Sequence, residues 1–182
     1  PTQSSLTRMK RLLRYMKETE DFAQEICMKD GMPKHVDAWA DSNYANDRGT
    51  RKSTSCGSIM LGSRGHIKNY SRGQANVALS SGEAENNANC TAVCEAVFIR
   101  NLFAEIGHHL IVRLHTDSSA ARAMSQRLGP GKVKHMEVKT MFLQHMVKKK
   151  ELEVVKEKSL EQIADLGTKF HGVYDHYRLL RM

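Results

Sequence analysis

Four acidic residues stand where a folded chain could bring carboxylates together: Asp41, Glu85, Asp117 and Asp165. Asp41 follows the apolar run "VDAWA" and Asp117 follows "LIVRLHT", so each stands where a strand is expected to end. Asp165 lies early in a helical stretch that comes directly after another strand. Strand ends of one sheet lie close together and often carry ligand sites. Without histidine or cysteine spacing around them, these acids would make a hard oxygen site suited to magnesium rather than zinc.

The run "ALSSGEAENNANCTAVCEA" places two glutamates two positions apart at the start of an expected helix. Because a helix turns about 100° per residue, Glu83 and Glu85 point roughly 200° apart. Ser80 and Glu83 fit a capping box, which predicts a structural role for Glu83. Glu85 shares a stripe expected to face the sheet, with Ala88, Ala92, Ile99 and Phe103. A carboxylate there needs a cation or a metal, since burying an unpaired charge is costly.

The first half of the chain supplies elements that could position these acids. Apolar residues at helical spacing between positions 6 and 16 predict an amphipathic helix with a basic opposite face. A short strand is expected at about 36–40, then a hairpin around the turn at 63–65, then an extended run at 76–80. A long helix is expected from about 82 to 106.

The second half alternates differently. It predicts a strand ending at Asp117, a helix at 118–128, a break at 129–131 and a second helix over 133–150 with a basic last turn. Another strand follows at 151–157, and a final helical region opens near 159. Three antiparallel strands, followed by alternating helices and strands, predict an α/β fold in which helices pack on a mixed sheet.

Composition narrows the class of protein. The chain has 182 residues, 40% of them hydrophobic, which suits one domain with a small appendage. Its net charge of +8 favours a nucleic-acid partner, although a basic surface can also serve solubility alone. Four irregularly spaced cysteines predict neither a disulfide scaffold nor a zinc site. No signal peptide or long apolar run is evident, so we expect a soluble intracellular protein. The first residue, Pro1, suggests a piece of something longer.

Five runs in order resemble the ribonuclease H domain of copia-type retrotransposon polyproteins. They are "ADSNYANDRGTRKSTSCGSIML", "VALSSGEAE", "LHTDSSAARAMSQ", "KHMEVKTMFLQHMV" and "QIADLGTK". The N-terminal "MKRLLRYMKET" resembles the segment that connects the reverse transcriptase to that domain. The resemblance covers nearly the whole chain and implies three parts: a connecting segment at 1–33, a ribonuclease H-like domain at 34–170 and a helical tail at 171–182.

The resemblance implies a five-stranded ribonuclease H fold and an enzyme that cuts the RNA strand of RNA–DNA hybrids with two Mg²⁺ ions, for which Mn²⁺ can substitute. It assigns catalysis and metal binding to four residues: Asp41, Glu85, Asp117 and Asp165. The implied partners are the hybrid and the reverse transcriptase domain of the same polyprotein, in a cytoplasmic particle or the nucleus.

Two departures and one alternative accompany the resemblance. Family members commonly carry a second aspartate where this chain has Asn43, and an aromatic residue where it has Asn86. The loop residues Arg51, Lys52 and Ser53 could hold phosphate, although a solvated basic loop is an open alternative. The rival function is a catalytically inactive or domesticated transposon-derived module that binds nucleic acid or packs on a partner.

Overall fold

The computed structural model describes the chain apart from residues 1, 22, 24–30, 63–64, 128–136 and 182. Five strands form one mixed sheet in the order β3-β2-β1-β4-β5. They are β1 (His35–Asn43), β2 (Thr54–Leu61), β3 (Gly65–Gly73), β4 (Ile111–Thr116) and β5 (Leu152–Lys156). The first three are antiparallel neighbours, while β4 runs parallel to both β1 and β5. The predicted α/β fold with a mixed five-stranded sheet is therefore confirmed.

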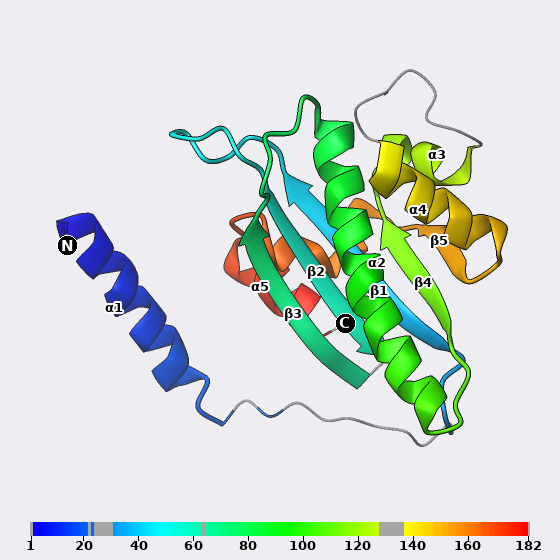
Figure 1. Cartoon of the computed structure of the whole chain (residues 1–182). Helices are drawn as coiled ribbons and strands as arrows, with labels where there is room; N and C mark the ends of the chain where they lie inside the picture. The colour runs from blue at the N-terminus through cyan, green and yellow to red at the C-terminus, as the bar shows by residue number, and fades with distance from the viewer. Residues whose placement is uncertain (1, 22, 24–30, 63–64, 128–136, 182) are drawn as a thin grey trace.

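Helices cover one face of this sheet. The long helix α2 (Ser81–Glu105) lies across it, with α3 (Ser119–Gln126) and α4 (Glu137–Lys148) beside it (Figure 1). Alternation along β1 turns Val36, Ala38 and Ala40 toward α2, where each is fully buried. Small alanines on α2 allow helix and sheet to approach closely, and the main core lies between them.

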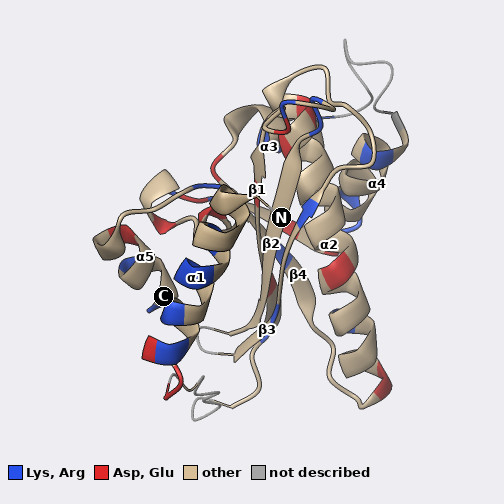
Figure 2. Cartoon of the chain, turned by 90° about the vertical axis from the view of Figure 1, so that its left-hand side faces the viewer, with Lys and Arg blue, Asp and Glu red and all other residues tan. Residues whose placement is uncertain are grey.

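The opposite face carries shorter elements. Two 3₁₀ helices, η2 (Ser159–Glu161) and η3 (Ile163–Gly167), follow β5 and lead to α5 (Val173–Leu180). Figure 2 shows α5 on the side of the sheet away from α2 and α4. The segment η3 packs on β1 and β2. Side chains of β1 that point away from α2, such as Asp41, therefore meet η3.

The predicted N-terminal helix is present as α1 (Gln3–Glu18), which begins at the Thr2 cap. This helix contacts α5 through the ring of Tyr15, whose centroid lies 5.9 Å from that of the His176 ring in α5. None of its residues is buried, and its apolar stripe is between 37% and 58% exposed. That stripe consists of Leu6, Met9, Leu12, Leu13 and Met16.

Two local predictions were wrong. The run at 76–80 is irregular rather than extended strand, because β3 already occupies the edge of the sheet and the chain must cross from there to the start of α2. Asp41 lies inside β1, which continues to Asn43, rather than after it. Asp165 lies in the 3₁₀ helix η3, in agreement with the predicted helical stretch. The predicted break at 129–131, the first residues of the helix after it and part of the hairpin turn lie outside the described residues.

Candidate active site

The start of α2 separates the two glutamates. The Ser80 hydroxyl accepts a hydrogen bond from the Glu83 backbone N–H at 3.1 Å. The Glu83 carboxylate accepts from the Leu79 N–H at 2.7 Å, one residue before the cap that the sequence predicted. Glu83 is therefore a capping residue, as expected. The second glutamate, Glu85, points toward the end of β1, where its carboxylate accepts a hydrogen bond from the Ser42 backbone.

The four predicted acids meet around the C-terminal ends of β1 and β4. Because these strands are parallel, Asp41 in β1 and Asp117 just after β4 lie at the same edge of the sheet. Glu85 arrives from the helical face and Asp165 from η3 on the opposite face. Asp41 and Asp165 are 2% and 7% exposed. In the tertiary structure, four carboxylates thus surround the C-terminal ends of β1 and β4.

Electrostatics confirm that these acids influence one another. Burial, together with the negative charges of Asp41 and Asp117, raises the pKa of Glu85 to about 8, against smaller opposing effects of Ser42 and Lys169. Burial also raises the pKa of Asp165, assisted by the Asp41 carboxylate. The site therefore favours protonation, or a cation, over four free negative charges.

One cation that the sequence reasoning missed lies among the acids. The Lys169 ammonium is 2.7 Å from Asp165 Oδ1 and 3.7 Å from Asp41 Oδ2. Burial alone would lower the pKa of Lys169, but its bond to Asp165 and the charges of the nearby aspartates raise it overall. The available signal was its place four residues after Asp165, a spacing at which side chains can meet.

Uncharged residues also pack around the four acids. Cys56 lies opposite Asp41 on β2, and burial raises the pKa of its thiol to about 11, so the thiol stays neutral. Gly167 packs directly on this thiol, and a Cβ built there would lie 3.1 Å from Cys56 Cβ. The Ser71 hydroxyl donates to the Gly167 carbonyl at 2.6 Å. Glycine is needed here because the turn that carries Asp165 lies so close to the sheet.

Comparisons with known proteins identify relatives of the chain and of its fold. No family model matches the chain. It is 28% identical over 172 residues, 93% of its length, to the retrovirus-related Pol polyprotein from transposon RE1 of Arabidopsis thaliana. It is 30% identical over 163 residues, 88% of its length, to the corresponding polyprotein from transposon TNT 1-94 of Nicotiana tabacum. The chain spans only 12% of the length of each relative.

Solved structures show the fold. LC11-RNase H1, isolated from compost, superimposes with a TM-score of 0.57 at 15% identity, covering 72% of this chain and 91% of that one. The N-terminal ribonuclease H domain of a Mycobacterium tuberculosis protein gives 0.53 at 11% identity, covering 81% and 96%.

The chain is a homologue of plant retrotransposon Pol polyproteins and has the ribonuclease H fold.

The structure accounts for both departures of this Pol homologue from its family pattern. The Asn43 amide donates to the Thr168 carbonyl at 2.9 Å, a bond that an aspartate carboxylate could not donate. The Thr168 hydroxyl in turn donates to Asp41. Asn86 is fully buried between α2 and α4, where its amide donates to Thr140 Oγ1 at 3.2 Å. Neither asparagine removes one of the four acids.

The carboxylates fit a hard divalent cation in one specific respect. Glu85 Oε2 is buried and has no hydrogen-bond partner among the described residues, so it is an acceptor left without a donor. Oxygen ligands of this kind suit Mg²⁺ or Mn²⁺. Within the described ranges, however, no three His, Cys, Asp or Glu side chains are arranged to hold a metal ion. Metal binding by these four residues of the Pol homologue remains a prediction.

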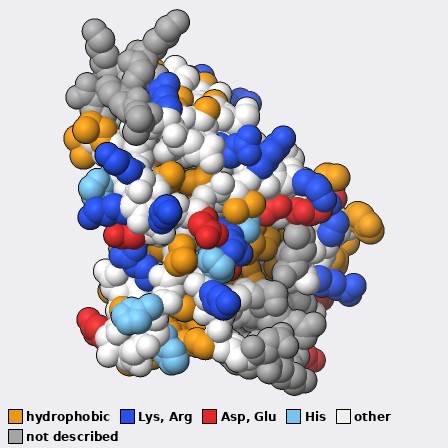
Figure 3. Space-filling view, turned by 90° about the vertical axis from the view of Figure 1, so that its right-hand side faces the viewer, with side chains coloured by type: hydrophobic (Ala, Val, Ile, Leu, Met, Phe, Trp, Pro, Cys, Tyr) orange, Lys and Arg blue, Asp and Glu red, His pale blue; other side chains and the backbone are white. Residues whose placement is uncertain are grey.

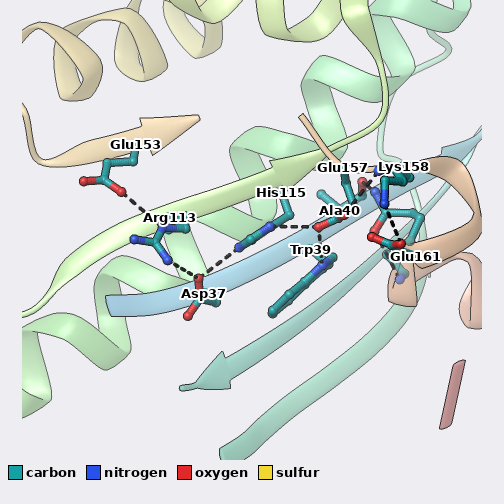
Figure 4. Close-up of polar contacts among 11 residues, drawn as sticks. Asp37, Trp39, Ala40, Arg113, His115, Glu153, Glu157, Lys158 and Glu161 are labelled. Carbon is teal, nitrogen blue, oxygen red and sulfur yellow. Dashed lines mark hydrogen bonds and ion pairs between the residues drawn. The ribbon is translucent and has the colours of Figure 1, made fainter. Parts of the chain in front are cut away.

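Another acid of β1 belongs to a separate network. Asp37 Oδ1 contacts His115 Nε2 at 2.9 Å and lies 3.8 Å from the Arg113 guanidinium. The other nitrogen of His115 lies 3.0 Å from Glu157, and its ring stacks on Trp39 at a centroid distance of 4.2 Å. Figure 4 shows this network running along β1, β4 and β5. Asp37 therefore pairs with His115 and Arg113 rather than with the four acids.

The loop between β1 and β2 carries the predicted phosphate contacts. Arg51 is exposed and has a positive φ of 57°, while Lys52 is half-buried. Ser53 is only 1% exposed, and its hydroxyl accepts from the Ala45 N–H at 3.0 Å. Ser53 thus stabilises the loop, and phosphate binding by these three residues stays a prediction. Among the described residues, Cys56, Cys90 and Cys94 are free, as expected. No described helix has the length and apolar character needed to cross a bilayer.

Proposed function

We propose that the chain is a ribonuclease H that hydrolyses the RNA strand of RNA–DNA hybrids, as one domain of a retrotransposon polyprotein. One observation carries this proposal: four carboxylates meet at the C-terminal ends of β1 and β4, where Glu85 Oε2 is buried and accepts no hydrogen bond from the described residues. The proposed parts are a connecting segment at 1–33, the catalytic domain at 34–170 and a tail at 171–182. The proposed partner in the same polyprotein is the reverse transcriptase domain.

Each acid would contribute oxygen ligands from a different element. Asp41 and Asp117 approach from adjacent parallel strands, Glu85 from α2 and Asp165 from η3. Two divalent ions bound there would supply an activated water and would stabilise the leaving 3′ oxygen. Carboxylates carried on the sheet and on the helices packed against it would limit the reorganisation needed during the reaction.

Basic side chains would hold the nucleic acid. The chain carries eight more positive than negative charges, and Figure 3 shows Lys and Arg side chains spread over the side of β5 and α4. The loop residues Arg51 and Lys52 connect β1 to β2, close in sequence to Asp41. Contacts of this kind neutralise phosphates and position the duplex without reading its sequence.

Cleavage of a labelled hybrid tests the proposal. The chain is expected to cut the RNA strand in Mg²⁺ or Mn²⁺ and to leave it intact in EDTA. Glu85→Gln should abolish cleavage, whereas Glu83→Gln should retain it because Glu83 caps the helix. Equal cleavage by the Glu85 variant and the parent would contradict the assignment.

The rival is an inactive module that binds nucleic acid, and two observations favour it. Lys169 already contacts two of the acids, and no described group of three potential ligands is arranged for a metal. An inactive module would bind the hybrid without cutting it and would show no heat of Mn²⁺ binding in calorimetry. The enzyme would both cut the hybrid and show a heat of Mn²⁺ binding.

A further inference from the structure

We propose that Lys169 is a built-in counter-cation of the acid cluster, which a metal ion must displace, so that this side chain sets the metal affinity of the site. The inference rests on the proposed metal site. It assigns Lys169 a positioning role, because the side chain acts through the acids.

The geometry places the ammonium where a metal would need oxygen ligands. Lys169 Nζ lies 2.7 Å from Asp165 Oδ1 and 3.7 Å from Asp41 Oδ2. A carboxylate oxygen that accepts from an ammonium has fewer lone pairs to offer to a cation. A metal ion and the ammonium therefore compete for Asp165 Oδ1, while the ammonium acts on Asp41 through its charge alone.

The charge of Lys169 reaches the whole cluster. It acts on Glu85, and the charges of Asp41, Asp165 and Asp117 act on it in return. Without a cation, four carboxylates this close would repel one another and weaken the folded state. One ammonium offsets part of that repulsion while the site holds no metal.

The backbone of this segment is fixed while the side chain keeps room to move. The Asn43 amide holds the Thr168 carbonyl, and the Lys169 N–H donates to the Asp165 carbonyl at 3.0 Å. His171 Nε2 also contacts that carbonyl at 3.0 Å. By contrast, the Lys169 side chain is 45% exposed, so its flexible stem can swing toward solvent without disturbing the core.

The aspartates it neutralises have no such freedom. Their side chains are 2% and 10% exposed, and Asp41 also accepts from the Thr168 hydroxyl. Displacement of the ammonium therefore frees Asp165 Oδ1 and removes the positive charge beside Asp41, whose bond from Thr168 remains. Only those molecules in which the ammonium has left the acids can bind metal. The apparent metal affinity of the protein is therefore lowered in proportion to the fraction of such molecules.

Lys169→Met removes the charge and keeps an unbranched apolar stem. Lys158→Met is the matched control, because Lys158 pairs with Glu161 in an exposed segment and its loss changes the net charge equally. Lys169→Arg is a second variant that keeps the charge. All are compared as the full 182-residue chain in one buffer at one pH.

Two measurements are made on each protein: the melting temperature in EDTA, and Mn²⁺ binding by calorimetry. Lys169→Met should melt lower than the parent in EDTA yet bind Mn²⁺ more tightly, on the order of tenfold, the size of a typical coupling between two ligands. Lys158→Met should match the parent in both, and Lys169→Arg should stay close to the parent. The opposite signs for stability and affinity distinguish a counter-cation from a merely structural side chain.

The outcomes separate this inference from the proposed function. Mn²⁺ binding by the parent with equal or weaker binding by Lys169→Met would overturn the counter-cation role and leave the metal site standing. Binding by the variant alone would support the role in its strongest form. Absence of binding in every protein would overturn the metal site and the inference together. If Lys169→Met is too unstable to measure, Lys169→Arg decides the question. A tenfold shift in the Mn²⁺ affinity of Lys169→Arg would contradict the counter-cation role.

Discussion

Replacing Glu85 by glutamine should stabilise the metal-free protein at high pH. Burial first, and then the charges of Asp41 and Asp117, raise the pKa of Glu85 from its ordinary 4.5 to about 8 in the folded chain. Between these values the folded protein holds a proton that the unfolded chain has released. The free energy of unfolding therefore falls as the pH rises through this window and levels off above it.

The magnitude follows from the pKa difference. At about 1.4 kcal/mol for each pH unit, the change from 4.5 to about 8 sets an upper limit of about 5 kcal/mol. Glu85 is partly exposed, so solvent screening reduces this value, and we expect about 2 kcal/mol. Glutamine carries no charge at any pH and should avoid this loss.

Denaturant unfolding in EDTA at pH 5 and pH 9 measures the effect. The stability of Glu85→Gln relative to the parent should be about 2 kcal/mol more favourable at pH 9 than at pH 5. Burial also raises the pKa of Asp165, but that contribution is present in both proteins and cancels in the difference. Glu105→Gln, at the exposed end of the same helix, is the control and should show no such trend. A difference between variant and parent that does not depend on pH would refute the argument from burial and repulsion.

Three further predictions follow from the packing and charge of the site. Gly167→Ala should destabilise the fold by about 1–3 kcal/mol and reduce cleavage, because the new methyl group meets Cys56; the exposed Gly73→Ala, with open space around it, should do neither in the same melts and assays. Asp41→Asn should abolish hybrid cleavage but keep binding in a gel-shift assay, and parental cleavage would contradict its role as a ligand. Hybrid affinity, measured by fluorescence anisotropy, should fall at least about tenfold between 50 and 200 mM salt, whereas an unchanged affinity would count against phosphate contacts.

The class of fold and the order of its main elements could be predicted from the sequence, whereas the assignment of the four acids stays a prediction. Hydrophobic alternation and helical periodicity are local properties, so they can be read from neighbouring residues. The capping role of Glu83 was likewise predictable, because a capping box spans only a few residues. The convergence of Asp41 and Asp117 required only that two strands end at one edge of a sheet.

Tertiary structure alone decided how the site is neutralised. Lys169 and Asp41 are far apart in the chain, and they meet because η3 packs on the face of the sheet opposite α2. The bond from Asn43 to Thr168 has the same origin, and it explains an asparagine that from the sequence was only a departure from a family pattern. The raised pKa of Glu85 depends on burial and on two other carboxylates, which no local pattern records. Side-chain contacts between distant segments depend on how the layers pack, and sequence spacing carries no information about that packing.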